Sequence, residues 1–225
     1  MVRFIIRFAV VALSVAAVSV TINSAVAAPQ AAPQRSEGEQ LFQQGHYPEA
    51  MAWWTEHAAQ GDIESARRLG MQYMDGLPWV TQRDYAKARQ YHLQAAMGGE
   101  RRSMMDLGTI YENGFGVTAS LTEAARWYEW SAKYGYAPAQ QNFATLLETG
   151  EGGRKDEVEA LMYFMLVAID SAKSLGNKPN IDKPDPESEI GHLAPLLTPA
   201  QRAEAKARAL KFVPLTGPLP ASENH

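Results

Sequence analysis

The residue types that most often carry catalysis or bind metals are few and scattered in this sequence. It contains five histidines and no cysteine. The histidines are His46, His57, His92, His192 and His225. None lies three or four residues from another, so no predicted helix presents the paired ligands that a zinc site would need. His92 takes a position that other parts of the chain fill with an aromatic residue, and we expect it to pack in the core.

Carboxylates cluster around a glycine-rich loop in the second half of the chain. They are Glu148, Glu151, Asp156, Glu157 and Glu159. Paired carboxylates perform acid–base chemistry in glycosidases. Acidic residues are also favoured in the first turn of a helix, where the helix dipole stabilises them. We interpret the cluster as helix-start and solvated-loop charges, with cation or glycan binding as the open alternative.

Other signatures of catalysis are absent from the sequence. The glycine run from Gly150 to Gly153 lacks the Gly-Lys-Ser/Thr ending and the preceding strand of a phosphate-binding loop. No Gly-x-Ser-x-Gly nucleophile elbow occurs. We therefore predict that the chain is not an enzyme and has no catalytic residues, no cofactor and no metal. A hydrolase remains the least supported alternative.

The elements that must position any binding residue belong to a repeated unit. Aromatic residues recur every 36 residues at Tyr91, Trp127 and Tyr163, each with an alanine three residues before it and another five after it. A second ladder places Leu-Gly at 69–70 and 107–108. Periods of this size indicate stacked supersecondary units. We therefore predict an all-α solenoid, a fold that usually presents a long binding surface.

Each unit is predicted to pair a short helix with a longer one. The short helices are expected over 64–74, 102–112 and 138–148, and the long helices over 84–97, 121–134 and 156–171. Gly61, Gly99 and Gly135 close the long helices, where a left-handed C-cap is wanted. Gly70 and Gly108 lie inside the short helices, where glycine costs about 1 kcal/mol relative to alanine. Close crossing of helices is the expected compensation.

The first 27 residues have the pattern of a cleaved signal peptide. Arg3 and Arg7 form a basic region, 8–20 is an apolar run, and Ala25-Val26-Ala27 fits a cleavage site. The apolar run is short of the roughly 20 residues that a spanning helix needs, which argues against an uncleaved anchor. We predict cleavage after Ala27, a periplasmic or secreted location, and no membrane span in the mature chain.

The charge and the lack of cysteine exclude other classes of protein. The full chain has a net charge of −4, and loss of the two leader arginines makes it two units more negative. This is not the basic surface that nucleic-acid binding requires, so we predict no nucleic-acid partner. Without cysteine there is no disulfide framework and no lipid attachment at a lipobox.

The remaining segments flank the repeats. We predict a disordered lead-in over 28–37, the solenoid over 38–172, a linker over 173–186, a C-terminal helical cap over 187–213, and a disordered tail over 214–225. The main cap helix is expected over 199–212, because Thr198 and Gln201 form a capping-box pattern. Its expected apolar stripe is Ala203, Ala207 and Leu210.

The repeated positions together resemble a known family. The chain is similar to Sel-one-like repeat proteins, relatives of the tetratricopeptide repeats. The unit that matches best contributes Ser103, Leu107, Gly108, Tyr111, Gly114, Gly116, Val117, Ala124, Trp127, Tyr128, Ala132 and Gly135. The resemblance implies a right-handed α–α superhelix of about three repeats, with an N-terminal half repeat and a C-terminal capping helix.

The resemblance also implies a role. Bacterial members of this family are mostly exported or envelope adaptors and regulators, including regulators of exopolysaccharide. A cysteine-rich branch is linked to penicillin binding and hydrolysis, and this chain departs from it because it has no cysteine. We therefore expect a periplasmic or secreted adaptor or regulator of a cell-envelope process, with a protein partner in the envelope.

Analogy with tetratricopeptide grooves assigns candidate partner-binding residues on the short helices. They are Arg67, Met71, Met74, Arg102, Met105, Glu112, Gln141 and Glu148. Methionines adapt to a partner's apolar side chains, and the arginines would orient acidic or backbone groups. Whether the methionines line the groove or fill gaps between units stays open at this point.

Two aromatic residues fall outside the repeat pattern. Trp79 and Trp130 are binding hot-spot candidates if they are exposed. They would also serve as stacking platforms for a sugar. A peptidoglycan- or polysaccharide-binding module is therefore the alternative function.

Overall fold

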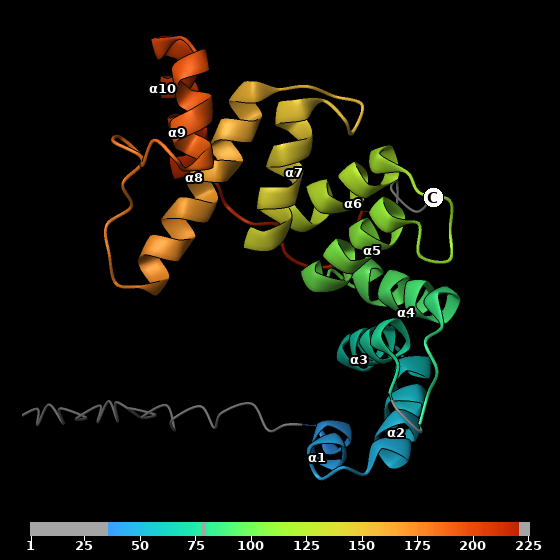
Figure 1. Ribbon diagram of the computed structural model, residues 1–225. Coiled ribbons are helices and arrows are strands. Elements are labelled where there is room, and N and C mark those ends of the chain that lie inside the picture. The colour runs from blue at the N-terminus through green and yellow to red at the C-terminus, as the bar shows by residue number, and fades with distance from the viewer. Residues whose placement is uncertain (1–35, 78–79, 221–225) are drawn as a thin grey trace, which may run out of the picture. The chain divides into compact units, whose positions relative to one another are not determined.

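The computed structural model describes residues 36–77 and 80–220, and its regular structure there is helical (Figure 1). The predicted signal peptide and Trp79 lie outside the described residues. The paired helices are α1 (Glu37–Gln43), α2 (Tyr47–Ala59), α3 (Ile63–Asp75), α4 (Tyr85–Met97), α5 (Arg101–Asn113), α6 (Leu121–Lys133), α7 (Ala137–Thr149) and α8 (Glu157–Ser174). The C-terminal elements are α9 (Glu189–Leu193), the 3-10 turn η1 (Ala194–Leu196) and α10 (Pro199–Lys211).

The helices stack in chain order. From α1 to α8, each helix packs against the helix before it and the helix after it, and α10 packs against α8. Contacts between successive helix pairs are the defining feature of a solenoid. The prediction of an all-α solenoid is confirmed.

Short polar side chains fix where most helices begin. Asp62, Asp84, Ser120 and Asp156 each accept a hydrogen bond from the backbone N–H three residues later, at the start of α3, α4, α6 and α8. Such caps satisfy amide groups that have no partner inside the helix. The predicted bounds agree with the structure to within about two residues, except that α8 runs on to Ser174. The two helices of each of the first two repeats both have 13 residues, so the predicted contrast between a short and a long helix is wrong for these repeats.

Glycines inside the first helix of a pair receive rings from the second helix. A Cβ placed on Gly70 would lie 2.8 Å from three atoms of the His92 ring, and one placed on Gly108 would lie 2.4 Å from Cε1 of Tyr128. No alanine fits at either site without moving the ring. The predicted close helix crossing is confirmed, and His92 is a buried core residue.

The largest hydrophobic cluster lies at the C-terminal end of the stack. It joins residues of α6, α7, α8 and α10, and every residue from 160 to 166 in α8 is buried. A helix that is apolar on all sides must be covered on all sides. Because α8 has no following repeat, α10 supplies part of that cover.

The cap helix forms with the predicted start but the opposite face. Thr198 and Gln201 make both bonds of the capping box. However, Ala203, Ala207 and Leu210 are exposed, and Ala205 and Ala209 are buried instead. The predicted stripe is wrong because alanines occur on several faces of this helix, so their spacing alone does not identify the face that packs on α8.

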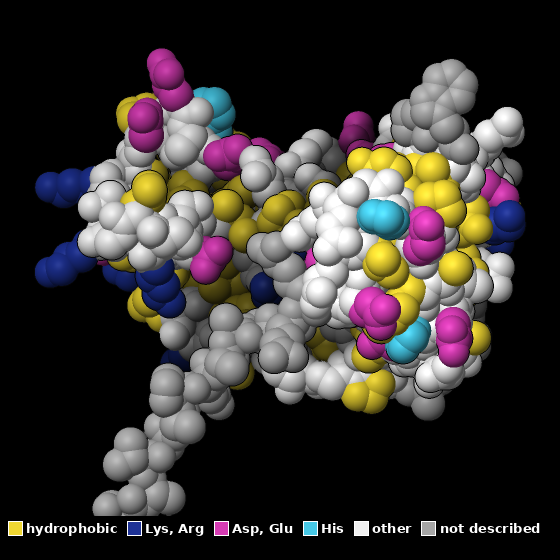
Figure 2. Space-filling view, turned by 90° about the horizontal axis from the view of Figure 1, so that it is seen from below, with side chains coloured by type: hydrophobic (Ala, Val, Ile, Leu, Met, Phe, Trp, Pro, Cys, Tyr) yellow, Lys and Arg dark blue, Asp and Glu magenta, His cyan; other side chains and the backbone are white. Residues whose placement is uncertain are grey.

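The surface mixes charged and apolar side chains. Figure 2 shows hydrophobic and acidic side chains interspersed over one face, with basic side chains gathered at one end of it. None of the helices in the described part of the chain is both long and apolar enough to cross a bilayer.

Candidate functional site

A pocket of about 310 Å³ lies between the first and second full repeats. We call it the inter-repeat pocket. Its lining residues are Arg67, Met71, Met74, Asp75, His92, Arg102, Asp106 and Tyr136. Four of the eight predicted groove residues are therefore brought together here.

One face of α3 forms the first wall of the pocket. Arg67, Met71 and Met74 are spaced four and three residues apart, so they project from the same side of the helix. Both methionines are half-buried. Both line the pocket, and Met74 also packs against a core cluster, so it contributes to both the groove and the core.

Arg67 is held rigidly at the base of this wall. It is only 6% exposed. Its guanidinium donates two hydrogen bonds to Glu64 and one to Sδ of Met71. The bonds to Glu64 raise the pKa of Arg67, so it keeps its charge. Since Glu64 already neutralises it, Arg67 acts as a positioning residue for Met71 more than as a free anion receptor.

Buried titratable groups form the second wall. His92, from α4, is fully buried, and its Nδ1 lies 3.2 Å from Oγ of Ser103 and 3.5 Å from Oδ2 of Asp106. Burial, with the nearby Arg67 charge, lowers the pKa of His92 to about 4. His92 is therefore neutral at physiological pH.

The pKa of Asp106 is shifted upward, so its carboxyl group keeps its proton to a higher pH than an exposed aspartate does. Burial, together with the neighbouring Glu100 carboxylate, raises the pKa of Asp106 to about 7. Its side chain is 32% exposed, so one side still faces the pocket. A carboxyl group in this state donates or accepts a hydrogen bond, depending on pH.

The rim of the pocket is polar and open. Arg102 and Asp75 are exposed, and Tyr136 is half-buried. The pocket thus combines apolar methionine surface with charges of both signs, which suits a peptide segment that has an apolar side chain and polar backbone groups. Among the described residues, no three His, Asp or Glu side chains are grouped so as to hold a metal ion.

The other predicted groove residues lie elsewhere. Met105 is half-buried against the C-terminal cluster. Glu112 accepts a hydrogen bond of 2.6 Å from the Tyr128 hydroxyl. Gln141 donates to Glu189 and lines a separate pocket between α7, α8 and α9. Glu148 is half-buried near the end of α7. None of the four lines the inter-repeat pocket.

Of the two tryptophans outside the repeat pattern, Trp130 lies within the described residues. Its side chain already contacts other residues. It is half-buried and packs against a core cluster, and Nζ of Lys133 lies 4.9 Å from the ring centroid. One face of the indole is therefore already occupied by a cation. This geometry does not favour a sugar-stacking platform at Trp130.

Four lining residues of the pocket were not among the eight candidates: Asp75, His92, Asp106 and Tyr136. Asp75 is the last residue of α3. Asp106 stands directly before Leu107, His92 belongs to the second helix of its repeat, and Tyr136 caps the N-terminus of α7. The groove template considered only certain positions on the first helix of each repeat. Two features of the sequence could have identified Asp106 and His92. One is a charged residue directly before the Leu-Gly pair, and the other is a histidine at a position that other repeats fill with an aromatic residue.

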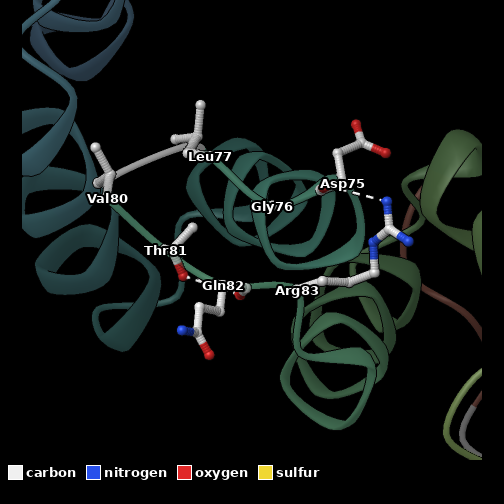
Figure 3. A pocket seen from close by; sticks show the side chains of 7 residues that line it. All are labelled: Asp75, Gly76, Leu77, Val80, Thr81, Gln82 and Arg83. Atoms are coloured by element: carbon white, nitrogen blue, oxygen red, sulfur yellow. Dashed lines mark hydrogen bonds between the residues drawn. The ribbon is translucent and has the colours of Figure 1, made fainter.

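A loop borders a second hollow beside the inter-repeat pocket. In Figure 3 the side chain of Arg83 reaches across to the backbone carbonyl of Asp75, at 3.5 Å. Leu77 and Thr81 form a bridge at the base of the loop. Positions 78 and 79 of this loop lie outside the described part of the chain.

Comparison with known proteins identifies the repeats. Residues 63–100, 101–136 and 137–164 match the Sel1 repeat family. The chain contains three Sel1 repeats. The matched segments coincide with the helix pairs α3–α4, α5–α6 and α7–α8, although the last match ends inside α8. The resemblance seen in the sequence is thereby confirmed.

A solved Sel1 repeat protein shares the fold. A Sel1 repeat protein from Oxalobacter formigenes superimposes with a TM-score of 0.52 and is 25% identical, over 65% of this chain and 62% of that one. The protective antigen c5321 of uropathogenic Escherichia coli, with an SLR fold, gives a TM-score of 0.43 at 18% identity, over 77% of this chain and 43% of that one.

Curated relatives match a short stretch only. DAP3-binding cell death enhancer 1 of Rattus norvegicus is 40% identical over 70 residues, and that of Mus musculus is 34% identical over 70 residues. The match covers 31% of this chain and 14% of either relative. Sel1 repeats are protein–protein interaction modules, and their solenoid is typically an interaction scaffold without catalysis.

Proposed function

We propose that this chain is a protein-binding adaptor or regulator of a cell-envelope process, which acts in the periplasm or outside the cell after its leader is cleaved behind Ala27. A segment of its protein partner lies over the inter-repeat pocket. One observation carries the proposal: the pocket gathers Arg67, Met71, Met74 and Arg102, which were selected from the sequence as binding residues.

The chemistry of the pocket defines what the segment offers. The half-buried surfaces of Met71 and Met74 fit an apolar side chain, and methionine adjusts to its shape. Exposed Arg102 and Asp75 stand on the rim, where charges set orientation and association rate more than affinity. The partner therefore inserts one apolar side chain and places polar groups at the rim.

Met71→Asp tests the proposal. The change puts a charge at the apolar floor, and we expect it to weaken partner capture at least ten-fold. Met71 is half-buried and not fully enclosed, so the helix should still form with Asp at this position. Leu93→Asp is the matched control, because Leu93 lies on α4 outside the pocket and is 37% exposed.

The assay is crosslinking of the exported protein in envelope extract of its own organism, with the captured proteins identified by mass spectrometry. A protein captured by wild type and Leu93→Asp, and lost with Met71→Asp, supports the proposal. Equal capture by all three forms would show that the pocket is not the binding site. N-terminal sequencing of the purified protein tests the leader, and Ala28 is the expected first residue.

A further inference from the structure

The segment after α10 lies along the turns that join successive repeats. Figure 1 shows it running from α10 back towards α5 and α6. The N–H of Leu215 donates to the carbonyl of Lys133 at 2.9 Å, and the N–H of Leu219 donates to the carbonyl of Met97 at 3.0 Å. The Tyr134 hydroxyl donates to the carbonyl of Pro218 at 3.1 Å. These residues belong to the segment 214–225, which the sequence led us to expect as a disordered tail.

The acceptors of the two backbone hydrogen bonds occupy equivalent positions in successive repeats. Lys133 and Met97 are the last residues of α6 and α4 and stand 36 residues apart, whereas the two leucines stand four residues apart. The last carbonyls of a helix have no partner within it, so each repeat offers an acceptor at the same place. Four extended residues span about 13 Å, which suits the step over one intervening helix.

Two glycines leave the space that this segment needs to pass close to the turns. A Cβ on Gly99 would lie 2.0 Å from the carbonyl oxygen of Gly217, and a Cβ on Gly135 would lie 2.9 Å from Cγ of Pro214. Both glycines have positive φ, +92° and +75°, which a side chain would strain. The residues that cap the second helices therefore also allow another chain to approach closely.

One side chain anchors the segment. Leu219 is 7% exposed and packs with a core cluster of Ala96, Met104, Leu107, Ile110 and Tyr134. By contrast, Val213 is 79% exposed and Leu215 is 45% exposed. The burial of one leucine and a few hydrogen bonds favour the docked state, and the conformational entropy lost when the whole segment is ordered opposes it. The docked and released states must therefore be close in free energy.

We propose that this surface is a second peptide-binding site. We call it the turn track, made of the C-terminal turns of α4 and α6 and the Leu219 pocket. Its partner is an extended segment of another protein with apolar residues four apart and proline beside them. Residues 212–220 occupy the track in cis and must leave before the partner binds. The hydrogen-bonding residues of the track lie outside the inter-repeat pocket, and Met74, which lines that pocket, packs against the same core cluster as Leu219.

A synthetic peptide of residues 211–220 with a fluorescent label probes the track. The full-length variant Leu219→Asp is expected to release its own tail, because a carboxylate does not fit the apolar pocket. The peptide should bind this variant at least ten-fold more tightly than wild type, by fluorescence anisotropy. Val213→Asp adds the same charge at an exposed position and should behave like wild type.

Three results would overturn the proposal. One is no binding of the peptide to Leu219→Asp, and another is equal binding to Leu219→Asp and wild type. The third is a wild-type dimer that Leu219→Asp abolishes, which would assign the track to the tail of a second copy. A control peptide with Asp at both leucine positions should not bind.

Hydrogen exchange on the wild-type chain tests reversible docking without any variant. The amides of Leu215 and Leu219 should exchange at least 100-fold faster than amides in the middle of α6, because the tail opens locally. Equal protection would mean that the tail is a permanent part of the core, and the proposal would fail.

Discussion

Asp106→Asn should stabilise the protein increasingly as the pH rises above 4, with the full effect reached above about pH 7. Burial and Glu100 raise the pKa of Asp106 from 3.8 to about 7. The unfolded chain therefore releases this proton near pH 4, while the folded chain holds it until about pH 7. Between these values the unfolded state gains free energy of ionisation that the folded state lacks, so stability falls as pH rises.

The size of the effect follows from the shift. A difference of about three pKa units corresponds to about 4 kcal/mol at 1.36 kcal/mol per unit. The Asp106 side chain is 32% exposed, so solvent reduces this penalty, and we expect about 2 kcal/mol. Asparagine has nearly the same shape and does not ionise. The variant should be about 2 kcal/mol more stable than wild type at pH 8 and equal to it near pH 4.

Urea denaturation at several pH values measures the difference. His92 titrates in the opposite sense: its pKa is lowered to about 4, so its contribution to stability is lost as pH falls from 6.5 towards 4. Both proteins contain His92, so this term largely cancels in the difference. Asp75→Asn, on the exposed rim, is the control and should change stability by less than about 0.5 kcal/mol. If Asp106→Asn is less stable than wild type at pH 8, Asp106 is ionised and paired with an arginine, and the reasoning fails.

Two further predictions concern the fold. Gly108→Ala should lower the free energy of unfolding by about 1–2 kcal/mol despite the better helix propensity of alanine, because its Cβ would lie 2.4 Å from the Tyr128 ring; stability equal to or above wild type in urea denaturation would contradict this. Thr198→Ala should cost about 1 kcal/mol through loss of the capping box at α10, and an unchanged melting temperature would show that α8, not the cap, holds this helix.

The sequence was sufficient for the repeats because they depend on local spacing. Leu-Gly pairs, closing glycines and short polar caps each fix a helix end or crossing within one unit, and the same pattern recurs every 36 to 38 residues. The template also selected Arg67, Met71, Met74 and Arg102 for the groove. It also selected Met105, which lies half-buried against the C-terminal cluster and outside the inter-repeat pocket, because one helix carries different positions on adjacent faces.

The rest depends on contacts that spacing does not encode. Tyr134 and Pro218 are 84 residues apart, so nothing local shows that they meet. The pKa of Asp106 depends on which side chains surround it from α3, α4 and α5. The buried face of α10 was wrongly predicted because its alanines fit several faces equally well. Which face is buried depends on how the helix packs against α8.

The departure of the third repeat from the pattern accounts for the C-terminal architecture. Where the first two repeats close the second helix with Gly99 and Gly135, the equivalent position is Ser171, and α8 continues to Ser174. The apolar middle of α8, residues 160–166, is buried on all sides, and α10 supplies part of its cover. The Phe212 ring then packs edge-on to Tyr163 of α8, with centroids 6.5 Å apart, and directs the following residues towards the turn of α6. The apolar middle of α8 thus provides the docking surface of the cap, and the residues after Phe212 continue from there to the Lys133 carbonyl, the first acceptor of the turn track.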